Sequence, residues 1–146
     1  FNIIEWIRKV QDEKPRIDAL VSLLSNYGAK ASPDEESRDM ASLHYSVRFS
    51  FSGKVVVTIG IILMDHQTTS DVVIETMTTL PKTNCRKGFG SRAITALLQW
   101  ASSNKLTGVR ATQVNGAENE WFWRKKGFVQ APQPNPCNDF LWHEHQ

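Results

Sequence analysis

The chain has 146 residues, with 17 Lys and Arg against 15 Asp and Glu, and its formal net charge is +2. This length predicts one domain with a core large enough to need no disulfide or metal support. The chain is 40% apolar and 10% aromatic. With so small a net charge, this composition argues against a disordered chain and against a general nucleic-acid-binding protein.

The apolar segments also bear on location. The longest, residues 55–64, is interrupted by Thr58 and Gly60 and is too short to cross a bilayer, so we expect no membrane association. Charged residues interrupt the apolar pattern at the start of the chain, so no signal peptide is recognised. Two cysteines are too few for a disulfide scaffold and favour a reducing, cytoplasmic location. Because Phe1 stands where an initiator Met would be, we expect a trimmed chain or a piece of a longer one.

The first part of the chain is predicted to be helical. Apolar residues recur at helical spacing in two stretches separated by Pro15, and Gly28 is the expected C-cap of the second. These residues are Ile3, Ile4, Ile7 and Val10, then Ile17, Leu20, Val21 and Leu24. The sequence Ser32-Pro33-Asp34-Glu35 matches a capping box with Pro at the first helical position. It predicts a third, short helix that ends near Met40.

The middle of the chain predicts three strands. Apolar residues alternate with polar ones from His44 to Phe51, which is typical of a strand with one buried face. Residues 54–64 are rich in Val and Ile, which predicts burial on both faces. A third strand is predicted over residues 71–80, and Pro81 ends it.

Beyond Pro81, helical and strand patterns alternate. We predict helices over residues 91–103 and 117–126, the second ended by Gly127, and strands over residues 109–114, 128–129 and 140–143. Helices, then an antiparallel meander, then strand–helix–strand–helix–strand predict an α/β or α+β domain around a mixed sheet.

Charge is unevenly distributed along the chain. No Asp or Glu lies between Thr76 and Ala117. The same stretch carries six basic residues, namely Lys82, Arg86, Lys87, Arg92, Lys105 and Arg110. This distribution predicts a positive potential suited to a small polyanion, and a solvated basic face is the alternative interpretation.

The segment Cys85-Arg86-Lys87-Gly88-Phe89-Gly90-Ser91 lies between a predicted strand and a predicted helix. Its two glycines allow a tight turn and a close approach of backbone N–H groups to a ligand. The start of the following helix adds the positive end of its dipole, and three basic side chains (Arg86, Lys87 and Arg92) add full charge. We therefore predict a phosphate or pyrophosphate site, with turn geometry alone as the alternative role of the glycines.

Two known phosphate-binding patterns do not fit this segment. A Walker loop requires G-x-x-x-x-G-K-[ST], which is missing. Residues 88–93 do fit G-x-G-x-x-A, but a dinucleotide fingerprint also needs an acidic residue about 20 positions later. The predicted strand at 109–114 has no carboxylate, and too few strand–helix units follow.

A third pattern fits. Residues 73–81 (VIETMTTLP), residues 86–91 (RKGFGS), Asn115 and residues 122–128 (FWRKKGF) together resemble the GNAT superfamily of N-acetyltransferases. The resemblance covers about residues 72–129 and includes both C-terminal family signatures in order. It implies a mixed, mostly antiparallel central sheet flanked by helices, with a splayed strand pair that holds the cofactor. It also implies an enzyme that moves an acetyl group from acetyl-CoA to a primary amine by direct attack.

The resemblance assigns cofactor contacts to particular residues. Backbone groups of Met77, Thr78 and Thr79 are expected to pair with the pantetheine arm. The loop is expected to hold the pyrophosphate through Arg86, Lys87, Gly88, Phe89, Gly90 and Ser91. Asn115 is a candidate for orienting the cofactor arm or a water, and the helix that carries Trp121, Phe122 and Trp123 is expected to line the thioester end.

Glu75 is the predicted catalytic base, because an amine of pKa about 10 must lose a proton before it attacks. Its alternative role is that of a charge partner for Arg110 or Arg48. His44 lies on the polar face of its strand and is predicted to be solvated rather than a second base. His143 and His145 have no third ligand nearby in the sequence, so no metal site is predicted.

Two residues depart from the family pattern. Cys85 stands where Gln or Arg is usual, and Trp123 stands where a Tyr often donates a proton to the leaving thiolate. An indole N–H is not a usable acid. These departures support an alternative hypothesis, a non-catalytic GNAT-fold module that binds CoA or another protein.

The expected partner is a small-molecule or peptide amine. The acidic residues Asp34, Glu35, Glu36 and Asp39 favour a cationic acceptor, with helix capping as their alternative role. The oligomeric state is left open, with a homodimer as one expectation.

Overall fold

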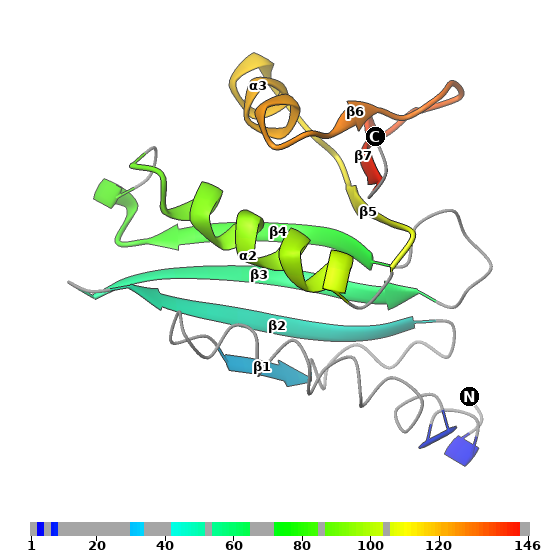
Figure 1. Cartoon of the computed structure of the whole chain (residues 1–146), viewed down its shortest axis with the longest axis horizontal. Helices are drawn as coiled ribbons and strands as arrows, with labels where there is room; N and C mark the ends of the chain where they lie inside the picture. The colour runs from blue at the N-terminus through cyan, green and yellow to red at the C-terminus, as the bar shows by residue number, and fades with distance from the viewer. Residues whose placement is uncertain are drawn as a thin grey trace.

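The computed structural model describes residues 3–4, 7–8, 30–33, 42–51, 54–64, 72–84, 87–103 and 106–143. The elements in chain order are β1 (Lys30–Pro33), β2 (Ser42–Phe51), β3 (Val55–Met64), β4 (Val72–Leu80), η2 (Lys82–Asn84), α2 (Phe89–Ser103), β5 (Gly108–Ala111), α3 (Ala117–Lys125), β6 (Val129–Gln130) and β7 (Phe140–His143). The strands form one seven-stranded sheet in the order β1-β2-β3-β4-β5-β7-β6 (Figure 1). Among these strands only β4 and β5 pair in parallel. The predicted mixed, mostly antiparallel sheet is therefore confirmed.

The core lies between one face of this sheet and α2. Alternate residues of β2 and β3 point into it, among them Val47, Phe49, Val57 and Ile59, all of which are fully buried. The helix contributes an apolar stripe in which Trp100 is the largest fully buried side chain. The opposite face of β3 is only half-buried, so the predicted burial on both faces holds for one face.

Both long helices make crossovers between strands. The helix α2 leads from β4 to β5 and lies over β3 and β4, close to the direction of these strands (Figure 1). The helix α3 leads from β5 to β6 and ends at Lys125, followed by Gly127 at φ 91°. Gly127 therefore stops this helix as predicted, since a positive φ is costly for any residue with a Cβ.

The start of the chain differs in part from the prediction. Ile3, Ile4, Ile7 and Arg8 have helical backbone, and their side chains are exposed. The second predicted helix and residues 34–40 of the third lie outside the described residues. The predicted helix start at Ser32 is wrong, because Ser32 and Pro33 belong to β1 and pair with Ser46 and Tyr45. Proline has no N–H to donate to a neighbouring strand. It is tolerated there because β1 is the edge strand of the described sheet and pairs with β2 on one side only.

Two other boundaries move, and both changes affect the candidate site. The helix α2 begins at Phe89 rather than at Ser91, so Gly90 and Ser91 belong to its first turn. The strand β5 ends at Ala111 rather than at Val114. Gln113 takes a left-handed backbone at φ 55°, which turns the chain out of the sheet.

Candidate functional site

The strand β4 pairs with the parallel strand β5 only along its first three residues. Their register pairs Val72 with Val109 and Ile74 with Ala111. The Ile74 carbonyl then accepts hydrogen bonds from the backbone N–H and the hydroxyl of Thr112, each at 3.2 Å. Past this point β4 continues to Leu80 alongside β3 alone. Among the described strands none covers the other edge of β4 beyond Ile74, and an uncovered edge can pair with an extended ligand.

A β-bulge interrupts β4 where the two strands part. Gly60 of β3 pairs with Thr76, but the next residue, Ile61, pairs with Ile74. Glu75 is therefore an extra residue with no partner on β3. A Cβ added to Gly60 would lie 2.6 Å from the Thr76 hydroxyl oxygen, so a larger residue there requires a shift of Thr76 or of β4. In the sequence alone, Gly60 is recognisable only as an interruption of an apolar run.

The Glu75 carboxylate meets the imidazole of His44. Glu75 Oε2 lies 3.5 Å from His44 Nδ1, and the side chains are 47% and 13% exposed. The prediction that His44 is solvated is therefore wrong. Arg110, one of the alternative partners considered for Glu75, instead forms an ion pair with Asp139 at 2.8 Å. A half-exposed carboxylate at the point where β4 and β5 separate is able to exchange a proton with a bound molecule.

The start of α2 has the features of an anion site. Gly88 has a φ of 88°, and its carbonyl accepts the first helical hydrogen bond, from the Arg92 N–H at 3.1 Å. Backbone N–H groups in the first turn of a helix have no partner within the helix, and they carry the positive end of its dipole. The first turn of α2 contains no acidic residue that would occupy them. A Cβ at Gly90 would lie 3.5 Å from the Met77 side chain, so the start of α2 lies next to the second half of β4.

Lys126 is a part of this region that sequence analysis missed. It follows α3, and its ammonium donates to the hydroxyl oxygens of Ser91 at 3.0 Å and Thr95 at 2.5 Å. Burial lowers the pKa of Lys126 below its usual value, since desolvation disfavours the charged form. The sequence contained a weak signal, a cation in the last turn of a helix before glycine, but it did not indicate a contact with a second helix.

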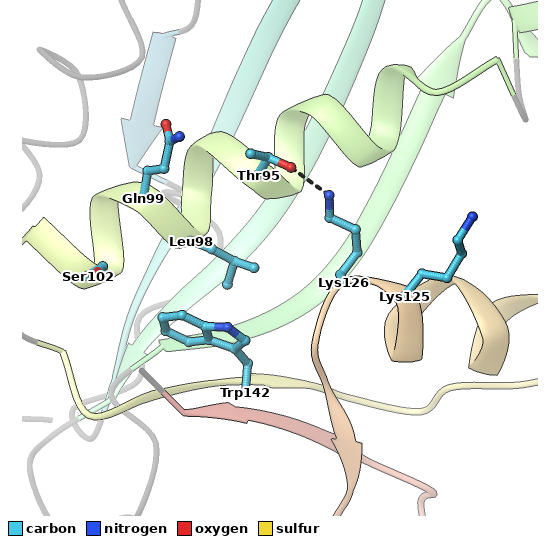
Figure 2. Close-up of a pocket in the computed structure, with 7 residues that line it drawn as sticks. All are labelled: Thr95, Leu98, Gln99, Ser102, Lys125, Lys126 and Trp142. Carbon is cyan, nitrogen blue, oxygen red and sulfur yellow. Dashed lines mark hydrogen bonds between the residues drawn. The ribbon is translucent and has the colours of Figure 1, made fainter. Parts of the chain in front are cut away.

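A groove lies beside this contact, between α2 and the layer formed by α3 and β7. Its volume is about 330 Å³, and its lining residues are Thr95, Leu98, Gln99, Ser102, Lys125, Lys126 and Trp142. Figure 2 shows Lys126 directed at Thr95, with Leu98 and the indole of Trp142 forming the apolar side of the groove. The ammonium of Lys126 therefore joins the α3 side of the molecule to the first half of α2.

Other predicted contact residues are dispersed. The Arg92 guanidinium lies 4.7 Å from the ring centroid of Phe51 on β2, so it is directed away from β5. Trp123 is 8% exposed and packs edge to face on Phe122 and Phe128 within the core. Asn115 is exposed in the turn before α3. Lys87 is exposed next to Gly88, whereas Cys85 and Arg86 lie outside the described residues.

The part of the chain that the structure describes has neither a metal-binding cluster nor a membrane-spanning helix. No group of three or more His, Cys, Asp or Glu residues there is arranged to hold a metal ion. In the same residues, no helix has both the length and the apolar character that crossing a membrane requires.

Comparison with known proteins supports the fold. No protein-family model and no curated protein matches the sequence. Among solved structures, an acetyltransferase of the GNAT family from Staphylococcus aureus Mu50 matches with a TM-score of 0.51 and 12% identity, over 90% of this chain and 78% of that one. The IAA acetyltransferase from Bacillus cereus ATCC 14579 matches with a TM-score of 0.50 and 11% identity, over 79% of this chain and 99% of that one. These matches confirm the predicted GNAT-like fold, and at such identities they establish the fold alone.

Proposed function

We propose that this chain is an acyl-CoA-dependent N-acyltransferase that moves an acetyl group from acetyl-CoA to a primary amine. One observation carries the proposal. The uncovered edge of β4 leads from a half-exposed carboxylate, Glu75, to the glycine-containing start of α2. A ligand bound along that edge would have a proton acceptor at one end and an anion site at the other.

The chemical character of this edge matches the parts of acetyl-CoA. The pantetheine arm carries amide groups, which can pair with the backbone of Met77, Thr78 and Thr79 as a further strand would. The pyrophosphate is an anion suited to the N–H groups of Phe89, Gly90 and Ser91 at the helix start. Lys87 next to this turn and Lys126 on Ser91 supply positive charge. Asn115, in the turn after β5, is the proposed contact on the other side of the gap.

The proposed reaction is a direct transfer. Glu75 accepts a proton from the acceptor ammonium, and the amine nitrogen then attacks the thioester carbonyl. The new C–N bond forms as the C–S bond breaks, and the thiolate of CoA leaves with the electron pair of that bond. A thiol with a pKa near 8.5 is a competent leaving group. The acylated nitrogen loses its second proton through water to the leaving thiolate, which gives the neutral amide and the CoA thiol. Trp123 is not assigned as the proton donor, because its indole is buried and is not an acid.

Calorimetric titration with acetyl-CoA tests the cofactor site. We expect a dissociation constant in the micromolar range for the wild-type chain and no binding for Gly90→Glu. A Cβ at Gly90 would lie 3.5 Å from the Met77 side chain, which is an ordinary contact, so this substitution tests charge rather than packing. Gln99→Glu is the matched control, because it adds the same charge to an exposed position later in α2 and should preserve binding. Absence of binding to the wild-type chain at near-millimolar acetyl-CoA refutes the proposal.

A panel of primary amines then tests transfer, with release of the CoA thiol as the readout. We expect turnover with the wild-type chain and a loss of about 10²–10⁴-fold for Glu75→Gln, which is the usual contribution of a general base. The buried Trp123 favours one alternative function, a module that binds acetyl-CoA without turnover. That alternative is supported if the wild-type chain and Glu75→Gln give the same trace rate with every amine.

A further inference from the structure

The contact between His44 and Glu75 crosses a whole strand. His44 is on β2 and Glu75 is on β4, with β3 between them. Neighbouring strands lie about 4.8 Å apart, so the two backbones are separated by roughly 9.6 Å. Both side chains must therefore extend over β3 to bring Nδ1 and Oε2 within 3.5 Å of each other.

Two features of the sheet allow this contact. His44 is aligned with Ile62 and Ile62 with Val73, so alternation along β4 places Glu75, two residues after Val73, on the face that carries His44. The residue of β3 opposite the bulge is Gly60, which has no side chain to stand between β2 and β4 on that face. His44 is aligned with Ile62, and its neighbour Tyr45 points into the core. The imidazole is thus held on the face that Glu75 reaches.

The exposure of the two groups indicates which of them meets the substrate. The His44 side chain is 13% exposed and that of Glu75 is 47% exposed. In Ser-His-Asp triads a buried carboxylate orients a more accessible imidazole, which then exchanges protons. Here the burial is reversed. The carboxylate is the accessible member, and the imidazole lies behind it.

Glu75 also has a particular need for a second contact. A glutamate side chain has several rotamers, and holding it in one of them costs conformational entropy. A base must nevertheless lie within hydrogen-bond reach of the proton that it removes. Because the bulge gives Glu75 no ladder partner, the ladder alone does not fix the direction of its side chain.

We propose that His44 is a positioning residue that orients the Glu75 carboxylate toward the acceptor amine. This inference rests on the proposed acyltransferase function. The imidazole donates its Nδ1–H to Glu75 Oε2, while the carboxylate accepts the proton from the ammonium and later releases it to water. His44 neither gains nor loses a proton in this cycle. It affects the rate by holding the carboxylate in the geometry for proton removal.

Steady-state kinetics of four single variants and one double variant test this role. We expect His44→Ala to lower kcat by about 10–100-fold, the range associated with a misplaced catalytic group. The KM for acetyl-CoA should be unchanged, since His44 lies on the other side of β3 from the uncovered edge of β4. His44→Asn should recover most of the rate, because its amide N–H can occupy the position of Nδ1–H. In a Glu75→Gln background, His44→Ala should cause no further loss, because the two groups act as a unit.

The matched control is Arg48→Ala, an exposed residue on the same strand and the same face as His44. It should leave kcat unchanged. The role of His44 is overturned if His44→Ala keeps wild-type kcat, if Asn fails to rescue, if Arg48→Ala loses as much rate, or if the losses at His44 and Glu75 multiply. Those outcomes leave the acyltransferase proposal intact, because the wild-type chain still turns over. A wild-type chain without turnover on any amine refutes both proposals.

A nitrogen NMR spectrum of the His44 ring gives a readout that does not depend on activity. It reports which ring nitrogen carries the proton. We expect the Nδ1–H form in the wild-type chain and a shift toward the Nε2–H form in Glu75→Ala. An unchanged spectrum would show that the imidazole does not donate to Glu75, which overturns the positioning role.

Discussion

Gly60→Ala is the substitution that most directly tests the bulge on which the candidate site depends. A Cβ at this position would lie 2.6 Å from Oγ1 of Thr76, well inside ordinary van der Waals contact, whereas the Cβ and backbone nitrogen of Thr76 are 3.9 Å away. The clash is therefore with one hydroxyl oxygen. Relief requires either a different rotamer of Thr76 or a separation of β3 from β4 beside Glu75.

Two opposing contributions set the size of the effect. Forcing an extra carbon into a packed site costs about 1–3 kcal/mol. Replacing glycine in a strand by alanine contributes about 0.5–1 kcal/mol of stability, because the unfolded chain has less freedom to lose. We therefore expect Gly60→Ala to lower the free energy of unfolding by about 1–2 kcal/mol. In a Thr76→Ala background the clash is absent, and Gly60→Ala should raise the free energy of unfolding by about 0.5–1 kcal/mol.

Urea denaturation of the wild-type chain, the two single variants and the double variant measures both effects. An unchanged m-value would show that the variants unfold from the same compact state. Gly90→Ala is a useful control, because its Cβ would meet the Met77 side chain at an ordinary 3.5 Å. If Gly60→Ala costs the same with and without the Thr76 hydroxyl, the contact with Thr76 does not explain the need for glycine and the reasoning is wrong.

Three other predictions concern the framework of the site. Burial lowers the pKa of Lys126, so between the folded-state pKa and 10.5 the unfolded chain binds more protons than the folded chain. Raising the pH through that window should therefore stabilise the wild-type chain relative to Lys126→Gln. Equal pH profiles of unfolding for the two proteins would contradict this. Gly108→Ala should lower the free energy of unfolding by about 2–3 kcal/mol in urea denaturation. Its Cβ would lie 2.9 Å from the backbone carbonyl oxygen of Trp142, which cannot rotate away. A neutral result would show that β5 and β7 can separate easily. Trp123→Ala should lower the free energy of unfolding by about 3–5 kcal/mol, because Trp123 is buried. Trp121→Ala, at a 62% exposed position, should change it by no more than about 0.5 kcal/mol. Similar losses for both variants would contradict the assigned burial.

Local patterns in the sequence predicted much of the fold. Alternation located β2, the continuous apolar run located β3, and Pro81 marked the end of β4. The helix α3 ends before Gly127 as expected, and β7 spans the residues predicted for it. These features depend on residues close together in the chain, where periodicity and backbone preferences act directly.

The prediction failed where a local preference competed with pairing to a distant strand. Ser32 and Pro33 carry the signature of a helix start, yet pairing with β2 places them in an edge strand. The sequence predicts a strand through Val114, but the left-handed turn at Gln113 and a hydrogen bond from the Val114 N–H to the Asn138 carbonyl end β5 at Ala111. Ladder pairing and long-range hydrogen bonds thus outweighed local propensity in both places.

The candidate site also combines features that follow from local sequence with features that depend on long-range contacts. The sequence by itself determined that a glycine turn precedes a helix without acidic residues, and it identified Glu75 on the strand before it. Only the tertiary structure decided that Glu75 lies in a bulge and meets His44, and that Lys126 reaches Ser91 from another helix. The physical reason is that a bulge is a property of the register between two strands, and the two contacts join residues far apart in the chain. Neither register nor long-range contact leaves a periodic signal in one strand or one helix.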